Sequence, residues 1–394
     1  MDEMVETVFG KLGEIYDGPH ATPNRLDSGP YFLNIASLKS GRLDLDLSDH
    51  VSEEDYKHWT RRVAPEPGDL LFSYETRLGE AALMPEGVRA CLGRRMALLR
   101  PNRSLVDPRF LLYFYLGPQF QRIIAQNAIH GATVPRIGLK TMPAWPVVVP
   151  PLTQQRAIAE VLGALDDKIA VNAVVSRKSR ELSNAIFDQH ARSGDSQELA
   201  SMSALITRGI APKYADSGLL VLNQKCVRNR SVDVAHARKT ASPSRGLERI
   251  LKKNDVLVNS TGQGTLGRAA RWTLGEEATV DSHITIVRFD ESIVDPVCGG
   301  FALLRLESQI ESLAEGSTGQ TELRKDLLGR LRIKVPPREC QGELGARLDE
   351  FDSLELSMAA ESRKLAEARD ELLPLLMSGK LRVKDAEQIV EEIA

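Results

Sequence analysis

Two long helical patterns dominate the distribution of apolar and polar residues along the chain. The first follows Pro150 and Pro151, and its apolar residues recur at steps of three and four: Ile158, Val161, Leu162, Leu165 and Ile169. The polar helical pattern continues to about Gln189. Proline fixes φ and lacks a backbone donor, so the two prolines suit a helix entry and not its interior. A helix this long is not stable alone on a surface, so the pattern predicts a partner helix.

A second long helix is predicted from about Cys340 to Leu373, and Pro374 is expected to end or kink it. Its apolar stripe comprises Leu344, Leu348, Phe351, Leu354, Met358, Leu365, Ala368 and Leu372. We expect the two helices to form an antiparallel coiled coil. The expected pairing residues are Ile158, Leu162, Leu165, Ile169, Leu344, Leu348, Phe351, Met358, Leu365 and Leu372.

The second half of the chain repeats the first at a spacing of about 186 residues. Landmarks match in the same order: 68–71 with 254–257, 78–82 with 266–270, 106–108 with 294–296, 131–133 with 316–318, 147–151 with 333–337, and Gln155 with Gln341. The chain is therefore an internal duplication in which each half combines a globular head with a long helix. Antiparallel pairing of the helices would relate the halves by a pseudo-twofold axis.

Short apolar runs between glycine and proline turns predict strands in both heads, and spaced apolar residues predict one helix in each. The strands are Tyr31–Ile35, Asp69–Ser73, Ala90–Leu99 and Trp145–Val149, then Gly218–Gln224, Asp255–Asn259 and His283–Phe289; the helices are Arg109–Ala128 and Val297–Ala314. The predicted fold class is α/β, with mixed α+β heads. The expected domains are a first head at 1–150, a helical spacer at 151–192, a second head at 193–337, and a helical spacer with its tail at 338–394.

Composition is that of a globular protein, with 42% hydrophobic and 27% charged residues among 394. The four cysteines, at positions 91, 226, 298 and 340, lie too far apart in sequence to suggest a zinc site. We find neither a secretory leader pattern nor an apolar run long enough for a membrane-spanning helix. We therefore expect a cytoplasmic chain with reduced thiols, no metal site and no membrane contact.

The net charge of −3 conceals an uneven distribution. Residues 219–275 carry eleven Lys or Arg against three acidic residues, a net of +8, whereas residues 341–394 carry thirteen acidic residues against seven basic ones, a net of −6. A concentrated basic stretch is the pattern expected of phosphate contacts, and it is equally a common pattern of solvated surfaces.

Enzyme signatures do not assemble into a catalytic centre. The GxGxxG at 262–267 follows a predicted strand, but a turn at 273–275 leaves no room for the helix that a dinucleotide site requires, so we expect a flexible loop. The nucleotide-binding GxxxxGK[ST], HExxH, GxSxG and the motif by which amino-methyltransferases hold a base are all absent. We interpret Asp166 and Asp167 as solvated helix charges and predict that the chain is not an enzyme.

The stretch from Pro150 to Ile169, Pro-Pro-Leu-x-x-Gln-Arg-x-Ile-Ala-x-x-Leu-x-x-Leu-Asp-Asp-Lys-Ile, resembles the central region of type I restriction–modification specificity subunits. The segment from Leu372 to Val383 resembles the end of that family's second helix, although the second helix departs from the pattern at 338–341 and 350–353. The resemblance covers the whole chain, head, helix, head and helix.

The resemblance implies that each head is a target recognition domain reading one half of a bipartite double-stranded DNA site. The helices would set the spacing of the half-sites and dock two methyltransferase (modification) subunits through the stripe residues named above. S-adenosylmethionine would bind to those partner subunits and no cofactor to this chain, and restriction (motor) subunits would join for cleavage. A protein-binding scaffold with duplicated heads remains the alternative function.

Within each head, the DNA contacts are expected at strand ends and in loops. Arginine and lysine bind phosphates and guanine, and side-chain amides bind adenine. The candidates, each of which is alternatively a plain surface residue, are Lys39, Arg42, Arg77, Arg136, Lys225, Arg228, Gln263, Arg268 and Arg324.

Overall fold

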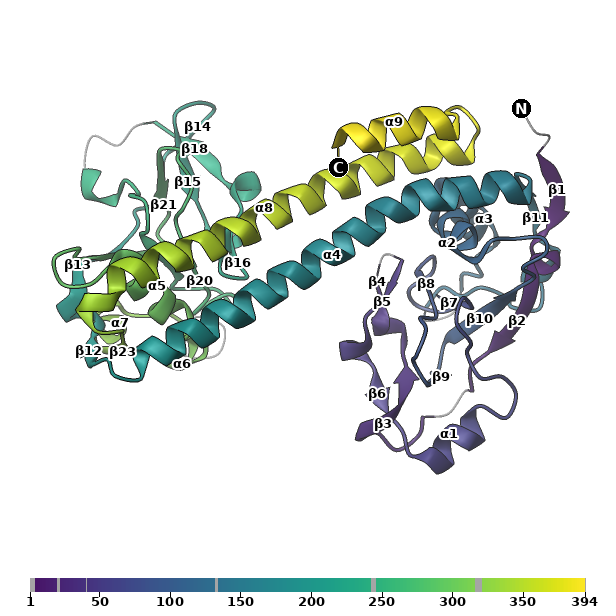
Figure 1. The fold of residues 1–394 in the computed structure, drawn as a ribbon, viewed down its shortest axis with the longest axis horizontal. Helices are drawn as coiled ribbons and strands as arrows, with labels where there is room; N and C mark the ends of the chain where they lie inside the picture. The colour runs from purple at the N-terminus through teal and green to yellow at the C-terminus, as the bar shows by residue number, and fades with distance from the viewer. Residues whose placement is uncertain are drawn as a thin grey trace. The chain divides into compact units, whose positions relative to one another are not determined.

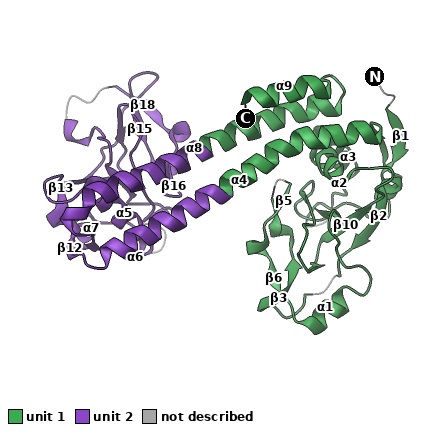
Figure 2. Ribbon diagram, in the orientation of Figure 1, with its two compact units in different colours: residues 1–173, 359–394 green, residues 174–358 purple. Residues whose placement is uncertain are grey.

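The computed structural model describes residues 4–19, 22–39, 41–131, 134–241, 246–315 and 321–393. Its internal contacts divide the chain into two compact units, residues 1–173 with 359–394 and residues 174–358 (Figure 2). The boundaries fall inside the long helices, so each unit contains one head and a part of each helix. The predicted match of 131–133 with 316–318, and Arg245 of the basic stretch, fall at least partly outside the described residues.

Two helices of 40 residues each, α4 (Leu152–Ala191) and α8 (Arg338–Met377), confirm the predicted long helices (Figure 1). In the first unit Asn172 on α4 donates to Glu361 on α8 at 2.7 Å, and in the second unit Arg180 on α4 donates to Glu355 at 2.6 Å. In the first unit Arg369 of α8 also donates to Asp166 of α4 at 2.7 Å, so the residue number on one helix falls as that on the other rises. The helices are therefore antiparallel in the first unit, as predicted.

Pro374 was expected to end or kink the second long helix, and the expectation that it ends the helix is wrong. Pro374 lies inside α8, which continues to Met377. A proline in the last turn removes a single helical hydrogen bond, and Leu376 and Met377 beyond it are buried in the core of the first unit. A further helix that we did not predict, α9 (Val383–Ile393), packs on the same core, with Ala386 fully buried.

The first head is built on a four-stranded antiparallel sheet of order β2-β10-β7-β8. A three-stranded sheet, β6-β3-β9, and two strand pairs, β4-β5 and β1-β11, complete it. The strands are β1 (Val5–Val8), β2 (Gly13–Asp17), β3 (Leu26–Leu33), β4 (Leu38–Lys39), β5 (Arg42–Leu43), β6 (Asp49–His50), β7 (Leu70–Ser73), β8 (Ala81–Leu83), β9 (Ala90–Leu92), β10 (Met96–Pro101) and β11 (Pro146–Val149). The helices are α1 (Glu53–Trp59), α2 (Pro108–Leu116) and α3 (Pro118–Asn127).

The second head repeats this plan. Its antiparallel sheet has the order β13-β22-β19-β20, and the parallel pair β15-β21 corresponds to β3-β9. The strands are β12 (Ser196–Glu198), β13 (Ser203–Arg208), β14 (Tyr214–Ala215), β15 (Leu219–Leu222), β16 (Val227–Arg228), β17 (Ser231–Val232), β18 (Arg238–Thr240), β19 (Val256–Asn259), β20 (Ala269–Arg271), β21 (Ala278–Val280), β22 (Ile284–Phe289) and β23 (Arg332–Lys334). The helices are α5 (Pro296–Leu304), α6 (Glu307–Ser312) and α7 (Lys325–Arg330). The predicted duplication and the mixed α/β class are confirmed.

Three predicted elements are each divided in two. The strand expected at 90–99 is β9 and β10, separated by a turn in which Arg95 has φ of 70°. The helix expected at 109–128 is α2 and α3, because Gly117 adopts an extended conformation before Pro118. The helix expected at 297–314 is α5 and α6, which separate at Arg305 and Leu306.

In each unit, apolar side chains of the long helices are buried in the core of the head. Ile158, Leu162 and Leu165 are at most 1% exposed and share one core with the α2 side chains, and Leu365 and Leu372 of α8 belong to that core too. Leu344 and Leu348 belong to the core of the second unit. Ile169, Phe351 and Met358 are half-buried. Burying one such aliphatic side chain contributes about 1.5–3 kcal/mol, so these residues fix the head on the helix. In the described residues, no helix combines the length and apolarity that a membrane span needs.

Candidate nucleic-acid interface

The candidate residues of the first head lie on three adjoining segments. Lys39 and Arg42 occupy the two arms of the β4-β5 hairpin. Arg77 lies in the loop after β7 and donates to the carbonyl of Ile35, just before that hairpin, at 2.9 Å. Arg136 forms a backbone bridge with the same loop. We call the turn and hairpin (34–43), the loop (74–80) and the return strand (134–137) the interface segments; residue 40 is not described.

The candidates of the second head occupy the corresponding interface segments, 223–232, 260–268 and 321–324. They are Lys225 in the turn, Arg228 in the hairpin, Gln263 and Arg268 in the loop after β19, and Arg324 before α7. The side chain of Asn259 donates to the carbonyl of Gln224 at 3.0 Å and so connects the turn to the end of β19. The loop at 262–267 contains no helix, as expected.

The contacts that build these segments are the same in both heads. The side-chain oxygen of Asn34 accepts from the N–H two residues ahead at 2.8 Å, and that of Asn223 does so at 2.9 Å. Each of these amides also donates to a backbone carbonyl thirteen residues ahead, at 2.7 Å. The loop and the return strand are joined through the carbonyl of Tyr74 in the first head, at 2.7 Å, and of Ser260 in the second, at 2.8 Å.

The basic side chains of the segments differ in what they already contact. Four of the basic candidate residues have no carboxylate partner within the described parts of the chain: Arg136, Lys225, Arg228 and Arg268. Lys39 pairs with Asp44 at 2.8 Å and Arg324 pairs with Asp326 at 2.7 Å, and each cation lowers the pKa of its carboxyl partner. Arg77 pairs with Glu80 at 3.2 Å. Exposed ion pairs contribute little to stability, so an external phosphate can replace them at little cost.

Comparisons with known proteins agree on one family. A family model described as the type I restriction modification DNA specificity domain matches residues 47–177, which include the Pro150–Ile169 stretch. The putative type I restriction enzyme MjaX specificity subunit of Methanocaldococcus jannaschii is 22% identical over 411 residues and covers 95% of this chain and 92% of its own length. The type I restriction enzyme MjaVIII specificity subunit of the same organism is 20% identical over 368 residues, which cover 86% of this chain and 85% of the relative.

This chain is similar to type I restriction–modification specificity subunits over most of its length. A solved structure, the S subunit of a type I restriction–modification system from M. genitalium, has the same fold, with a TM-score of 0.65 and 15% identity over 95% of this chain and 96% of that one. The resemblance carried by the Pro-Pro-Leu-x-x-Gln stretch is thereby confirmed.

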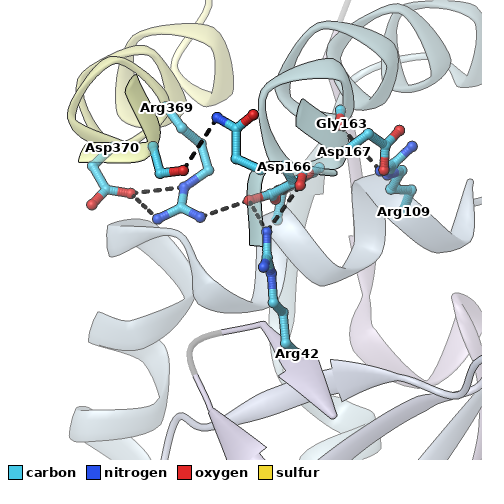
Figure 3. Close-up of polar contacts among 10 residues, drawn as sticks. Arg42, Arg109, Gly163, Asp166, Asp167, Arg369 and Asp370 are labelled. Carbon is cyan, nitrogen blue, oxygen red and sulfur yellow. Dashed lines mark hydrogen bonds and ion pairs between the residues drawn. The ribbon is translucent and has the colours of Figure 1, made fainter. Parts of the chain in front are cut away.

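The expectation that Asp166 is a solvated helix charge is wrong. Its side chain is 20% exposed, and Arg369 of α8 donates to it at 2.7 Å. Arg42, a DNA-contact candidate, donates to the backbone carbonyl of Asp166 at 2.9 Å and so reaches from the hairpin to α4 (Figure 3). Asp167 is 65% exposed and pairs with Arg109. The sequence pattern could not reveal these contacts, because they join segments far apart in the chain.

Two amides of the second head were not predicted from the sequence. The side-chain oxygens of Gln224 and Asn259 are buried and have no hydrogen-bond partner among the described residues. A Cβ at Gly262 would lie 2.4 Å from the Gln224 oxygen, so the glycine loop packs directly against this amide. The available signal was the position of Gln224 two residues beyond β15, at a strand end where we expected base contacts.

Proposed function

We propose that this chain is the sequence-specific DNA-binding subunit of a type I restriction–modification complex, in which each head reads one half of a bipartite double-stranded DNA site. The observation that carries the proposal is the repetition of the interface segments with the same hydrogen bonds in both heads. The side chains on these shared frameworks differ. Two unlike readers suit an asymmetric bipartite target.

Some residues of the interface segments would contact phosphates and others would contact bases, as in protein–DNA complexes generally. Arg136, Lys225, Arg228 and Arg268, which have no carboxylate partner in the described parts of the chain, are suited to phosphates, which position the protein without specifying sequence. Gln263, exposed in the loop after β19, carries an amide that pairs with adenine. Arg77 and Arg324 would exchange their present carboxylate partners for DNA.

The long helices would dock two methyltransferase subunits and set the separation of the half-sites, as the geometry of two linked readers does in other DNA-binding proteins. Support comes from apolar side chains that the helices leave exposed to between 38% and 55%: Val171, Val174 and Leu182 on α4, and Leu354 and Leu375 on α8. S-adenosylmethionine and the methyl-transfer chemistry would belong to those subunits, and restriction subunits would join for cleavage. This chain would act without catalysis of its own, in the cytoplasm.

Selection from a pool of random-sequence duplexes by the chain together with its methyltransferase subunits tests the proposal. We expect two short sequence blocks separated by unspecified base pairs, bound with an affinity that falls steeply as salt rises. Gel shift of the selected duplex against an unrelated duplex then measures specificity. Binding that is non-specific under all conditions would contradict the proposal, and affinity for protein partners with no salt-dependent DNA binding would favour a scaffold.

A further inference from the structure

Four segments of the first unit meet at the side chain of Asp166, on α4. Tyr113 of α2 donates its hydroxyl to one carboxylate oxygen at 2.6 Å, and Arg369 of α8 donates to the other at 2.7 Å. The guanidinium of Arg42, from the β4-β5 hairpin, lies 3.8 Å from the latter oxygen and donates to the Asp166 carbonyl at 2.9 Å. Figure 3 shows Arg42 and Arg369 approaching Asp166 from different elements.

The hydroxyl at this junction stays protonated. Tyr113 is 3% exposed, and burial together with the charge of Asp166 raises its pKa above the ordinary value. The phenol therefore remains a hydrogen-bond donor to Asp166 at neutral pH. A charge-assisted hydrogen bond of this kind is directional and about twice as strong as a neutral one.

Another arginine of the first head contacts the same turn of α4. Arg109 donates to the carbonyl of Gly163 at 3.2 Å and pairs with Asp167. A Cβ at Gly163 would lie 2.6 Å from the guanidinium carbon, so a larger residue at this position would require the Arg109 side chain to move.

The head is held at a second polar point on α4. Gln155, 1% exposed, binds the backbone of Asp107 at the start of α2 at 3.0 Å. Gln155 and Asp166 are eleven residues apart, which is about three helical turns and about 16 Å, so both face the head. The apolar contacts between them are non-directional. Two directional contacts prevent the head from pivoting about either one.

The duplicated position in the second unit makes a comparable connection. Asp352, 186 residues after Asp166, receives Arg271 from β20 of the head, and the same arginine donates to Asp349 at 2.9 Å. The Arg271 side chain is 3% exposed. Burial raises the pKa of Asp352, and the charge of Arg271 and its hydrogen bond oppose this effect.

We infer that Asp166 is a positioning residue: it fixes the angle of the first head on α4 and thereby the spacing of half-sites that the subunit accepts. The inference rests on the proposed function. One base pair of error moves a half-site by about 3.4 Å along the DNA and about 35° around it. A rigidly held head cannot follow that displacement, whereas a head released at Asp166 follows it in part.

The test uses the full chain in complex with its methyltransferase subunits and three duplexes: the target selected from the random pool, and derivatives with a spacer shorter or longer by a single base pair. The readout is the ratio of affinities for the correct and altered spacers. For Asp166→Asn we expect this ratio to fall by about tenfold, the factor that corresponds to one charge-assisted hydrogen bond. Tyr113→Phe, which removes only the hydroxyl, should lower it in the same direction by less.

Glu160→Gln is the matched control, because it makes the same charge change at an exposed position of α4 with no side-chain partner in the described residues. It should leave the ratio unchanged. An unchanged ratio in both junction variants overturns the inference while leaving the proposed function intact. If Asp166→Asn does not assemble, Tyr113→Phe decides alone. A wild-type complex that is indifferent to spacer length overturns the proposed function and the inference together.

Discussion

The side-chain oxygen of Gln155 accepts a hydrogen bond from the backbone N–H of Asp107 at 3.0 Å, and the oxygen of Gln341 accepts one from Asp295 at 2.8 Å. Each aspartate in turn caps the first helix of its head, α2 or α5, by accepting from two backbone N–H groups. Both glutamines are buried, and each also donates to the carbonyl of a proline that precedes its long helix. One amide in each unit thus joins the start of a long helix to its head.

Replacement of Gln155 by alanine should destabilise the protein by about 2–3 kcal/mol, because a buried N–H and a buried carbonyl lose their partner. Urea unfolding followed by circular dichroism measures the change. Gln189→Ala, at an exposed position near the end of α4, is the control and should change stability by less than about 0.5 kcal/mol. Equal stability of the two variants would contradict the structural role of the buried amide.

Leu165→Asp should disrupt the first unit. Leu165 is 1% exposed in the core that α4, α8 and the head share, and a buried charge without a partner costs more than about 4 kcal/mol. We expect loss of cooperative thermal unfolding and of assembly with methyltransferase subunits in co-purification. Val171→Asp places the same charge on the same helix at a side chain that is 55% exposed, and the fold should survive it. Retained folding and assembly of the Leu165 variant would show that the helix does not pack as described.

Asp281 provides a prediction about pH. Its side chain is buried, and burial raises its pKa, although the hydrogen bond from the His283 N–H opposes the shift. A raised carboxyl pKa means that the folded state binds the proton more tightly, so this group's contribution to stability falls as pH rises from the unfolded value, about 3.9, through the folded one. Asp281→Asn should therefore stabilise the protein more at about pH 7 than at about pH 4. Thermal midpoints at both pH values test this, and a gain that is larger in acid would refute it.

Lys225→Ala and Arg228→Ala should weaken DNA binding almost equally for the selected target and an unrelated duplex. Each should also reduce the slope of log affinity against log salt by about 1, because each removes one phosphate contact. Fluorescence anisotropy over a salt series measures both quantities. Arg177→Ala, at an exposed position of α4 outside the interface segments, should leave them unchanged. Equal slopes for wild type and both interface variants would exclude these residues from the interface.

The long helices and the duplication could be predicted from sequence because they depend on local periodicity and on repeated landmarks. The division of 109–128 into two helices had a readable signal, Gly117 followed by Pro118, that the apolar spacing obscured. The turn between β9 and β10 also had a signal, Gly93-Arg94-Arg95, which interrupts the apolar run, although residue type does not predict the left-handed φ of 70° at Arg95. The local sequence pattern also predicts which face of a helix carries a charged side chain, but not which residue that side chain contacts.

Asp166 and Arg42 illustrate that limit. Their contact joins positions 124 residues apart, and neither neighbourhood contains a pattern that relates them. The candidate DNA contacts were chosen by residue type and by strand ends, and they lie in corresponding turns, hairpins and loops of both heads. Which of them reaches a base depends on the position of bound DNA, which the sequence does not encode locally.

Mapping methylated bases in cells that carry this gene and its partner genes, and in the same cells after deletion of this gene alone, shows whether this chain directs methylation to a bipartite target. We predict a bipartite motif, two short defined blocks around a spacer of fixed length, that is methylated in the first cells and loses methylation throughout the genome in the second. Methylation that persists unchanged without this chain, or a lost motif consisting of one uninterrupted block, would contradict the account.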